Sequence, residues 1–532
     1  MPSSTPVFVP SSIGVVISSV FAAAFALLCY FWHRKLSRLP HRVVGEDVPA
    51  ELKKAAGLGR GNWIVFDRLS KVYGECSIFS FSLQGRPVVG AFINTPKLAW
   101  ELLEKRGEIY SSRPRLVIAH EILSGGLRGI TSQYNDHWRA WRRVQHIGMN
   151  GRQALEYREH QQLESVILLR DLAHTPEQSH DHLVRFASSV VLSISYGRRV
   201  KSTDDPAVTY NMRTVQSTPT LYVCVLPGKH LVDSWPILLR LPRPLQWFRH
   251  EYDKNFSEDV EFYLSMLKSV RERMAAGKQK ESMASRAIAS GEAQVPERQL
   301  AYYVAAPFGA GVHTTVATIE YAIMAALLFP EAAKKAQAEL DHVVGRGRLP
   351  TFADQSSLPY LGAWIKEVQR WQPIAPLAIP HATCREDDFD VFRIPKGSTV
   401  LANIYTMMHD PDMFPDSNVF CPERFLPGED GTQDSRFRDF TLPFGFGRRM
   451  CSGIHVASQS FFIVLARLVF LWAFNTTPAA DAPLPDPSAE IAGGLVRAPA
   501  PFQFALQPRF QEVSNILSLE AMEADIRLQE WE

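Results

Sequence analysis

The hydrophobic pattern of the chain begins with an uncharged run over residues 13–32. A helix of about twenty apolar residues is long enough to cross about 30 Å of bilayer hydrocarbon. Arg34 and Lys35 follow the run, whereas residues 1–12 contain no Lys or Arg, so the positive-inside rule places the remainder of the chain in the cytosol. The alternative is a cleaved signal peptide, which usually has a basic start and a shorter apolar core. We therefore expect a transmembrane anchor at residues 13–32, with residues 1–12 in the lumen.

A short connector, residues 33–59, precedes a long region of mixed periodicity. Within residues 60–95, the stretches CSIFSFSL and RPVVGAFI alternate on either side of a Gln-Gly pair, which predicts a β-hairpin, and residues 374–405 are again strand-like. Elsewhere apolar residues recur at helical spacing, which predicts helices over 97–106, 134–149, 154–172, 181–196, 251–276, 297–328, 331–343, 358–371 and 453–472. We expect a mainly α-helical domain with small β-sheets over residues 60–510, followed by a C-terminal extension over residues 511–532.

Prolines and glycines interrupt the helical pattern in two places. Residues 205–245 contain six prolines, which limit the length of regular elements there. The apolar helix predicted over residues 297–328 contains Pro307, Gly309 and Gly311 near its middle. Because proline lacks the amide donor and glycine lowers helix propensity, we expect a kink at this point. Residues that disfavour a helix inside a buried helix are typical of a functional site. The alternative is a loop between two shorter helices.

Composition narrows the class of protein without identifying it. The chain is 46% hydrophobic and 21% charged, which is ordinary for a globular protein. Its net charge of +2 gives no bulk electrostatic reason to bind nucleic acid. The six cysteines are scattered and form no CxxC pair, so we expect neither a disulfide framework nor a structural zinc site.

One of these cysteines, Cys451, lies in the sequence FGFGRRMCSG, which begins at Phe444. Glycines allow backbone amides to approach a sulfur closely, and hydrogen bonds from such amides stabilise a thiolate. A long apolar helix is predicted directly after the cysteine, and the positive end of its dipole also favours the anion. The pattern is therefore typical of a thiolate ligand for iron. The alternative is a structural cysteine in a glycine-rich turn, which would be the preferred interpretation if no other motif accompanied Cys451.

The pattern F-x-x-G-x-R-x-C-x-G around Cys451 resembles the heme-binding signature of the cytochrome P450 superfamily. The resemblance implies the cytochrome P450 fold, heme b (iron protoporphyrin IX) as the cofactor, and Cys451 as the axial ligand of its iron. It covers most of the chain. The phrases IYSSRPR (109–115) and PLAIPH (376–381) are similar to those of fungal microsomal members of secondary metabolism.

Other motifs resemble the family's heme-binding positions. Trp138 and Arg142 match W-x-x-x-R, and their i,i+4 spacing puts both on one helix face, from which they can reach a heme propionate. By the resemblance, His381 and Arg449 are further basic residues at the propionates, and Phe444 belongs to the cofactor-binding loop. Core packing is the alternative role for Trp138.

A separate set of motif residues is expected to support the fold. Glu367 and Arg370 match the family's E-x-x-R motif, and Arg424 lies in a PERF sequence that resembles its usual partner. The resemblance implies a buried charge network with a structural role, because a broken buried pair leaves a charge without a partner.

Ala310, Gly311, His313 and Thr314 resemble the A-G-x-[D/E]-T-[T/S] motif of the family's oxygen-activating helix. The resemblance implies a groove for dioxygen at Ala310 and Gly311, and proton delivery by the Thr314 hydroxyl and a water molecule. His313 stands where the family usually has a carboxylate. A histidine can relay protons near neutral pH, but it can equally turn outward and take no part.

The resemblance implies a monooxygenase of the endoplasmic reticulum membrane whose catalytic domain faces the cytosol. NADPH–cytochrome P450 reductase would supply electrons, with cytochrome b5 as a further donor, because the chain carries no dinucleotide or flavin motif in the right context. Positive charge for the docking surface of the reductase is expected from Arg142, Arg143, Arg436, Arg438, Arg448 and Arg449. Two alternatives are a heme-thiolate isomerase or dehydratase that needs no external electrons, and a heme-binding sensor.

The expected substrate is a hydrophobic small molecule, such as an intermediate of secondary metabolism. By likeness to the family, the pocket is framed by residues 112–130, 205–245, 305–314, 374–379 and 493–496. Most of its expected lining is apolar, namely Val117, Ile118, Leu377, Ala378 and Leu495.

Overall fold

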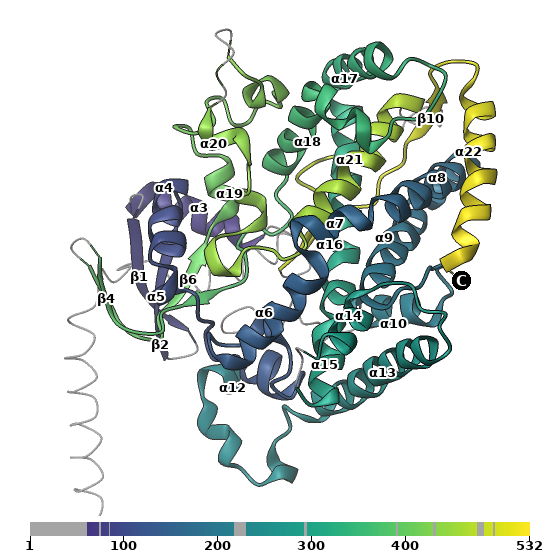
Figure 1. The fold of residues 1–532 in the computed structure, drawn as a ribbon. Coiled ribbons are helices and arrows are strands. Elements are labelled where there is room, and N and C mark those ends of the chain that lie inside the picture. The colour runs from purple at the N-terminus through teal and green to yellow at the C-terminus, as the bar shows by residue number, and fades with distance from the viewer. Residues whose placement is uncertain are drawn as a thin grey trace, which may run out of the picture.

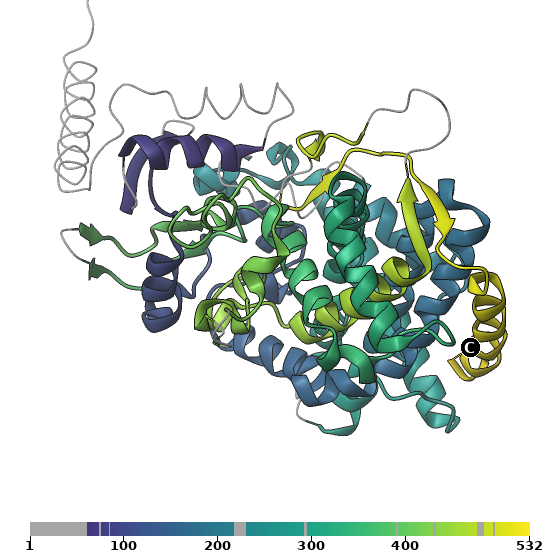
Figure 2. The ribbon, with the colours of Figure 1, turned by 90° about the horizontal axis from the view of Figure 1, so that it is seen from above.

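The computed structural model describes residues 61–73, 76–83, 86–216, 230–291, 295–389, 392–428, 432, 434–475, 484–492 and 495–531. The expected anchor at 13–32 and the connector at 33–59 lie outside these residues. Figures 1 and 2 show a large helical body with the sheet of the N-terminal region along one side.

The main sheet has four strands in the order β1-β2-β6-β3. Strands β1 (Cys76–Leu83) and β2 (Arg86–Ile93) form an antiparallel hairpin in which Cys76 faces Ile93, so the predicted hairpin is confirmed. Strand β6 (Thr399–Ala402) runs parallel to β2, and β3 (His381–Ala382) runs antiparallel to β6. Three two-stranded sheets pair β4 (Asp387–Phe389) with β5 (Phe392–Ile394), β7 (Trp472–Asn475) with β10 (Ala505–Pro508), and β8 (Glu490–Ala492) with β9 (Arg497–Pro499).

Helices make up most of the described chain. The longer ones are α3 (Asn62–Tyr73), α6 (Asp136–Met149), α8 (Arg158–His174), α9 (Ser179–Tyr196), α10 (Pro206–Gln216), α13 (His250–Ala275), α15 (Glu297–Val304), α16 (Ala306–Leu328), α17 (Pro330–Val344), α18 (Pro359–Trp371), α21 (Ile454–Leu471) and α22 (Val513–Leu528). The shorter ones are α4 (Pro96–Ala99), α5 (Gly107–Tyr110), α7 (Gly151–Glu156), α12 (Leu231–Ser234), α14 (Met283–Ala289), α19 (Ile404–Met408) and α20 (Ser435–Arg438). The helix predicted over 97–106 is α-helical only in α4 and continues as a π-helical turn, Trp100–Lys105.

The expected kink in the long apolar helix lies at a different residue from the one predicted. Helix α15 ends at Val304 and α16 begins at Ala306, so the break is at Ala305, and Pro307 falls in the first turn of α16. A proline is tolerated in the first turn because the amide that it lacks would have no partner inside the helix. The oxygen-motif sequence from Ala310 onward therefore runs as regular helix, and no loop separates α15 from α16.

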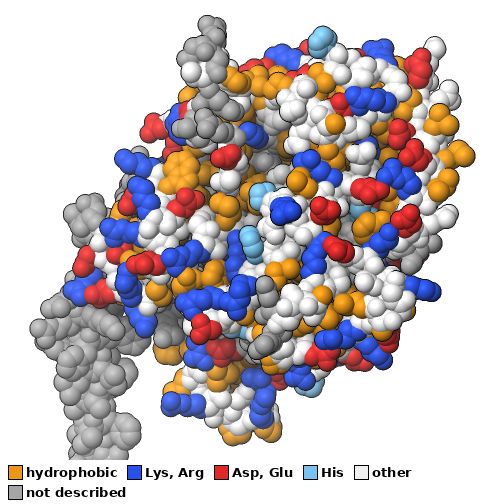
Figure 3. Space-filling model, in the orientation of Figure 1, with side chains coloured by type: hydrophobic (Ala, Val, Ile, Leu, Met, Phe, Trp, Pro, Cys, Tyr) orange, Lys and Arg blue, Asp and Glu red, His pale blue; other side chains and the backbone are white. Residues whose placement is uncertain are grey.

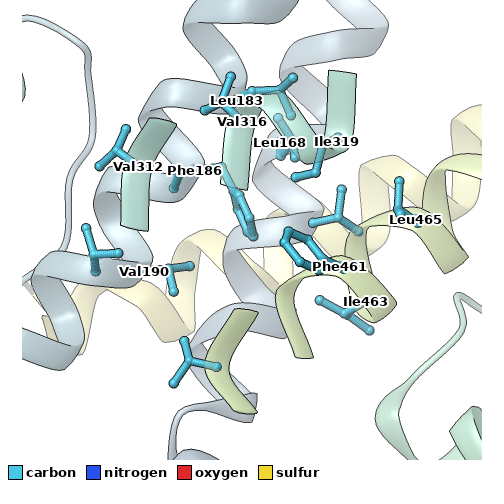
Figure 4. Close-up of a cluster of buried hydrophobic side chains, with 14 of the residues drawn as sticks. Leu168, Leu183, Phe186, Val190, Val312, Val316, Ile319, Phe461, Ile463 and Leu465 are labelled. Carbon is cyan, nitrogen blue, oxygen red and sulfur yellow. The ribbon is translucent and has the colours of Figure 1, made fainter. Parts of the chain in front are cut away.

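The core lies where α9, α16 and α21 meet. Figure 4 shows their apolar side chains interdigitating, with Phe186 and Val190 from α9, Val316 from α16 and Phe461 from α21. Within the described residues, the stretches Glu297–Leu328 and Ile454–Leu471 are long and apolar enough to cross a membrane, but most of each is buried inside the protein. These two stretches are therefore core helices.

The C-terminal extension expected over residues 511–532 forms helix α22, which lies beside α8 (Figure 1). Five of its side chains belong to the main hydrophobic core: Val513, Leu517, Ala521, Ala524 and Leu528. Its opposite face exposes Leu519, Met522 and Ile526. The extension is thus packed against the helical body along its inner face.

Candidate functional site

The loop that carries Cys451 is shaped by glycines and a neighbouring carbonyl. Gly447 has φ +52°, and an added Cβ would lie 2.3 Å from the backbone oxygen of Leu103. A side chain at this position would therefore strain the backbone and collide with the preceding segment. The loop closes on itself because the Cys451 amide donates to the Phe444 carbonyl at 2.9 Å, and α21 begins three residues later at Ile454.

The Cys451 sulfur lies deep in the protein and faces a cavity. Burial raises the pKa of the thiol, while a hydrogen bond from the Gly453 amide and the positive charge of Arg142 lower it. The sequence pattern predicted the lowering of this pKa by backbone amides but not by Arg142, and the loss of water outweighs both effects. Coordination to a metal cation ionises such a thiol outright.

Among the basic side chains that line the same cavity, Arg113, Arg142, His381 and Arg449 form one group. Burial, reinforced by Arg113 and Arg142, lowers the pKa of Arg449 to about 8, and burial lowers that of Arg113 to about 9. Burial and the neighbouring Arg113 also lower the pKa of His381 well below its usual range. These shifts describe a buried positive cluster with too little negative charge nearby.

The hydrogen bonds of this cluster leave donors without partners. Arg449 donates to the carbonyls of Ser111 and Ser132, and its guanidinium stacks on the Trp138 ring at 4.6 Å. Its Nη1 and the Trp138 Nε1 are buried and have no partner among the described residues. Arg142 donates to the Met450 carbonyl at 2.9 Å. Because Arg142 and Arg449 line the cavity, neither serves mainly as an exposed docking charge, contrary to expectation.

Helix α16 forms another part of the cavity wall. Ala310, Gly311 and Thr314 line the cavity, and the Thr314 hydroxyl donates to the Ala310 carbonyl at 2.8 Å. A Cβ on Gly311 would lie 2.6 Å from the Val191 side chain of α9, so only glycine allows the two helices to approach this closely.

His313 is placed differently from its neighbours in the motif. It is not among the cavity-lining residues, and its Nε2 is buried with no partner among the described residues. Burial, helped by His180, lowers the pKa of His313 to about 4. At neutral pH the imidazole is therefore almost entirely uncharged.

The structure brings Glu367, Arg370 and Arg424 together. The carboxylate of Glu367 accepts two hydrogen bonds from Arg370, at 2.7 and 2.9 Å, and both side chains are fully buried. The Arg424 Nε lies 3.3 Å from the same carboxylate, which also accepts the Cys421 amide at 2.8 Å. Arg370 further donates to the Met408 carbonyl. The network ties α18 to the segment before the cysteine loop.

The cavity has a volume of about 360 Å³. Of the expected apolar lining, Ala378 and Leu495 are present, whereas Val117, Ile118 and Leu377 are buried elsewhere. No described residue of 205–245 lines it. The lining includes Tyr263 of α13 and Tyr302 of α15, which sequence reasoning did not name and which carry no local signal. Arg113 and Arg128 fall within the expected frame of residues 112–130, and Arg113 also lies in the IYSSRPR phrase.

Heme fits this arrangement on physical grounds. The apolar walls suit a porphyrin, and Cys451 offers one soft axial ligand on one side. The two propionates of heme b would supply the negative charge that the buried cluster of Arg113, Arg449 and His381 lacks, and would satisfy the orphaned donor of Trp138.

Comparison with known proteins agrees with this geometry. The cytochrome P450 family model matches residues 52–506. Cytochrome P450 monooxygenases of Armillaria gallica and Postia placenta are each 34% identical, covering 86% of this chain and 88% and 86% of their own lengths. The fold is similar to a zebra fish cytochrome P450 solved with abiraterone, with a TM-score of 0.66 and 24% identity over 84% of this chain and all of that one. The chain therefore belongs to the cytochrome P450 family, is a monooxygenase, and uses heme as its cofactor.

Proposed function

We propose that this protein is a membrane-bound monooxygenase that inserts one oxygen atom into a hydrophobic intermediate of secondary metabolism. Electrons would come from NADPH through a separate cytochrome P450 reductase, with cytochrome b5 as a second donor. One observation carries the proposal: Cys451 and Thr314 line the same largely apolar cavity. Members of the family generally use a redox partner and act on hydrophobic substrates, which agrees with such a cavity.

Each group in the site has a part in this reaction. When bound, heme supplies the activation of dioxygen that makes oxygen insertion possible. Cys451 would ligate the iron, and Arg113, Trp138 and Arg449 would hold the propionates. Thr314 presents a hydroxyl within the cavity, and this hydroxyl can donate a proton there. The apolar side chains exclude bulk water and hold the substrate.

We propose that Thr314, and not His313, delivers protons during the reaction. Thr314→Val should raise hydrogen peroxide release per NADPH several-fold, because the hydroxyl is lost at constant shape. His313→Ala should change this ratio less than about twofold between pH 6 and 8, because an imidazole of pKa about 4 is rarely protonated there. Peroxide and product are measured together at fixed NADPH consumption. A large rise in peroxide for His313→Ala would assign the relay to the histidine.

The requirement for external electrons separates the proposal from a heme-thiolate isomerase or dehydratase. We expect product from candidate pathway intermediates only when NADPH, a reductase and dioxygen are all present, with one oxygen atom of the product derived from labelled dioxygen. Product formation without NADPH would favour the isomerase reading. The hydroxyl of Thr314 within the cavity favours the monooxygenase.

The reductase would dock on the face next to the cysteine loop. Arg143 and Arg448 are exposed there, and Arg448 also contacts the Tyr134 hydroxyl. Arg436 is already paired with Asp434, so it offers less free charge than the sequence suggested.

We propose that the chain is held at the endoplasmic reticulum by the apolar run at residues 13–32. A second feature supports a membrane-facing side: exposed apolar side chains gather on the segment around α12, at the lower end of Figure 3. Its most exposed members are Trp247 at 66% and Ile237 at 62%. Isolated patches of this kind mark interaction surfaces.

Deleting residues 13–32 should release the protein from membranes on alkaline carbonate extraction. The truncated chain should still bind phospholipid vesicles, and replacing Ile237 and Trp247 together by glutamate should weaken that binding at least about tenfold, because two apolar side chains lose their burial. Leu519→Glu, at an equally exposed site on α22, is the matched control and should have little effect. Vesicle binding that is insensitive to the double substitution would contradict this orientation.

A further inference from the structure

A polar cluster of buried and half-buried side chains, which we call the Arg128 cluster, lies at one end of the cavity. It consists of Arg128, from the loop before α6, with Tyr210 of α10, Asp259 and Tyr263 of α13, and Tyr302 of α15. Helices α13 and α15 pack side by side there (Figure 1). No motif of the sequence pointed to it, and the heme-binding residues do not account for it.

The carboxylate of Asp259 is fully used within the cluster. Its Oδ1 accepts the Tyr210 hydroxyl at 2.5 Å, and its Oδ2 accepts Arg128 Nη2 at 3.0 Å and the Tyr302 hydroxyl at 3.4 Å. The Asp259 side chain is 3% exposed. The acceptors of the cluster are therefore occupied by its own donors.

The cluster contains more hydrogen-bond donors than acceptors. A guanidinium carries five N–H bonds, and Arg128 has one hydrogen bond to Asp259, while its Nε is buried with no partner among the described residues. The Tyr263 hydroxyl lies within hydrogen-bonding reach of Arg128, and this side chain is only 6% exposed. A buried donor without a partner costs free energy, so the cluster favours an incoming acceptor.

The donors face the same cavity as the reacting groups. Arg128, Tyr263 and Tyr302 line it together with Thr314 and Cys451. The walls between are apolar and include Ala187, Val190, Val191 and Ile194. Tyr302 and Thr314 are twelve residues apart on consecutive helices that meet at Ala305, so the rise between them is at most about 18 Å at 1.5 Å per residue. The cavity thus has a polar end far from the oxygen-activating threonine.

We propose that Arg128 and Tyr263 anchor a hydrogen-bond-accepting oxygen of the substrate, a hydroxyl, carbonyl or carboxylate group. The rest of the substrate is apolar and elongated, and its far end is presented for oxidation beside Thr314. This inference rests on the proposed function and deepens it: the substrate is an already oxygenated hydrophobic molecule. A reaction that leaves an oxygen function on the apolar skeleton, such as an oxidation, a hydration or the hydrolysis of a thioester, must therefore precede this enzyme.

The anchor can be tested without knowing the substrate, by probes that are fixed at the heme iron. In 12-(imidazol-1-yl)dodecan-1-ol, the imidazole coordinates the iron and shifts its Soret band, and the chain carries a hydroxyl to the other end. 1-Dodecylimidazole is the same probe without the hydroxyl. Dissociation constants of both are measured by spectral titration of the holoenzyme. The hydroxyl probe should bind at least as tightly as the alkyl probe, although a hydroxyl costs more to bury in an apolar cavity.

Two variants should remove this preference. Tyr263→Phe should weaken the hydroxyl probe about three- to tenfold relative to the alkyl probe, as expected for one hydrogen bond. The double variant Arg128→Gln with Asp259→Asn removes the ion pair without leaving either charge alone, and should weaken it at least about tenfold. Ile194→Val, on the apolar wall, is the matched control and should affect both probes alike.

Chain length separates an anchor from a purely structural cluster. With 4-(imidazol-1-yl)butan-1-ol and 1-butylimidazole, which cannot span the cavity, the variants should leave the ratio of the two dissociation constants unchanged. Equal weakening of both long probes, or no weakening of either, would overturn the anchor. These titrations require no turnover, so they test the anchor independently of the reaction. If the probes bind as expected but the enzyme shows no NADPH-dependent activity, the anchor stands and the proposed function is refuted.

Discussion

Replacing Cys451 by serine should reduce NADPH-dependent product formation by roughly a thousandfold or more, to the background without enzyme. A serine hydroxyl is not ionised at neutral pH and is a poor ligand for heme iron, so the electron donation that assists oxygen activation is lost. The substitution changes one atom in the cavity wall, and the Cys451 amide still closes the loop onto Phe444. Product is measured by mass spectrometry in a host that expresses a reductase and the candidate intermediates.

Cys384→Ser is the matched control for this experiment. Cys384 is also a free cysteine, and its sulfur donates to the Glu108 carbonyl, away from the cavity. A serine there can make the same contact, so activity should stay within about twofold of native, because the hydrogen bond is kept. Retained activity in Cys451→Ser at normal heme content would contradict the thiolate assignment.

Arg370→Met should lower the free energy of unfolding by about 3–5 kcal/mol, because it leaves the fully buried Glu367 carboxylate without its main partner. Arg424 remains near Glu367 at 3.3 Å but does not replace the two short hydrogen bonds. The measurement is urea denaturation of the holoenzyme followed by the heme absorbance, with heme content determined separately.

An exposed ion pair of the same spacing provides the comparison. Lys334 and Glu331 are paired at 2.7 Å, but their side chains are 66% and 81% exposed. Lys334→Met should therefore change stability by less than about 1 kcal/mol. If the two variants were equally stable, the buried network would not have the structural role that we assign to Glu367 and Arg370.

The local parts of this fold were predictable because their signals are local. The β-hairpin follows from alternation around one Gln-Gly pair, and α16 and α21 follow from long apolar runs. The helix break was predicted in the right helix but at the wrong residue. Proline disrupts a helix interior but begins a helix readily, and the sequence around Pro307 does not say which position it takes.

The two sides of the site differed in how far sequence could describe them. The residues around Cys451 belong to one short motif, and Trp138 with Arg142 to another, and the resemblance of both motifs to the family implied that they meet at the heme. The Arg128 cluster draws its five residues from four segments: one each from α10, α15 and the loop before α6, and two from α13. No one of those segments contains a recognisable pattern, and only the packing of the helices reveals a polar end in a cavity expected to be apolar.

Electrostatics was the least predictable property of the site. The sequence favoured an ionised Cys451 and left His313 as a potential relay, but burial shifts both pKa values toward the neutral form. Arg142 and Arg449 were expected to contribute to a docking surface, yet they line the cavity and lack sufficient negative charge. Desolvation depends on the whole fold, which residue spacing does not encode.

The absorbance spectrum of the reduced protein with carbon monoxide tests the central claim most directly. If Cys451 ligates the heme iron as a thiolate, the Soret band of the native protein will shift to the position characteristic of thiolate-ligated heme, and the shift will be absent in Cys451→Ser. A native spectrum of the kind given by histidine-ligated heme, or an identical shift in the serine variant, would contradict the account.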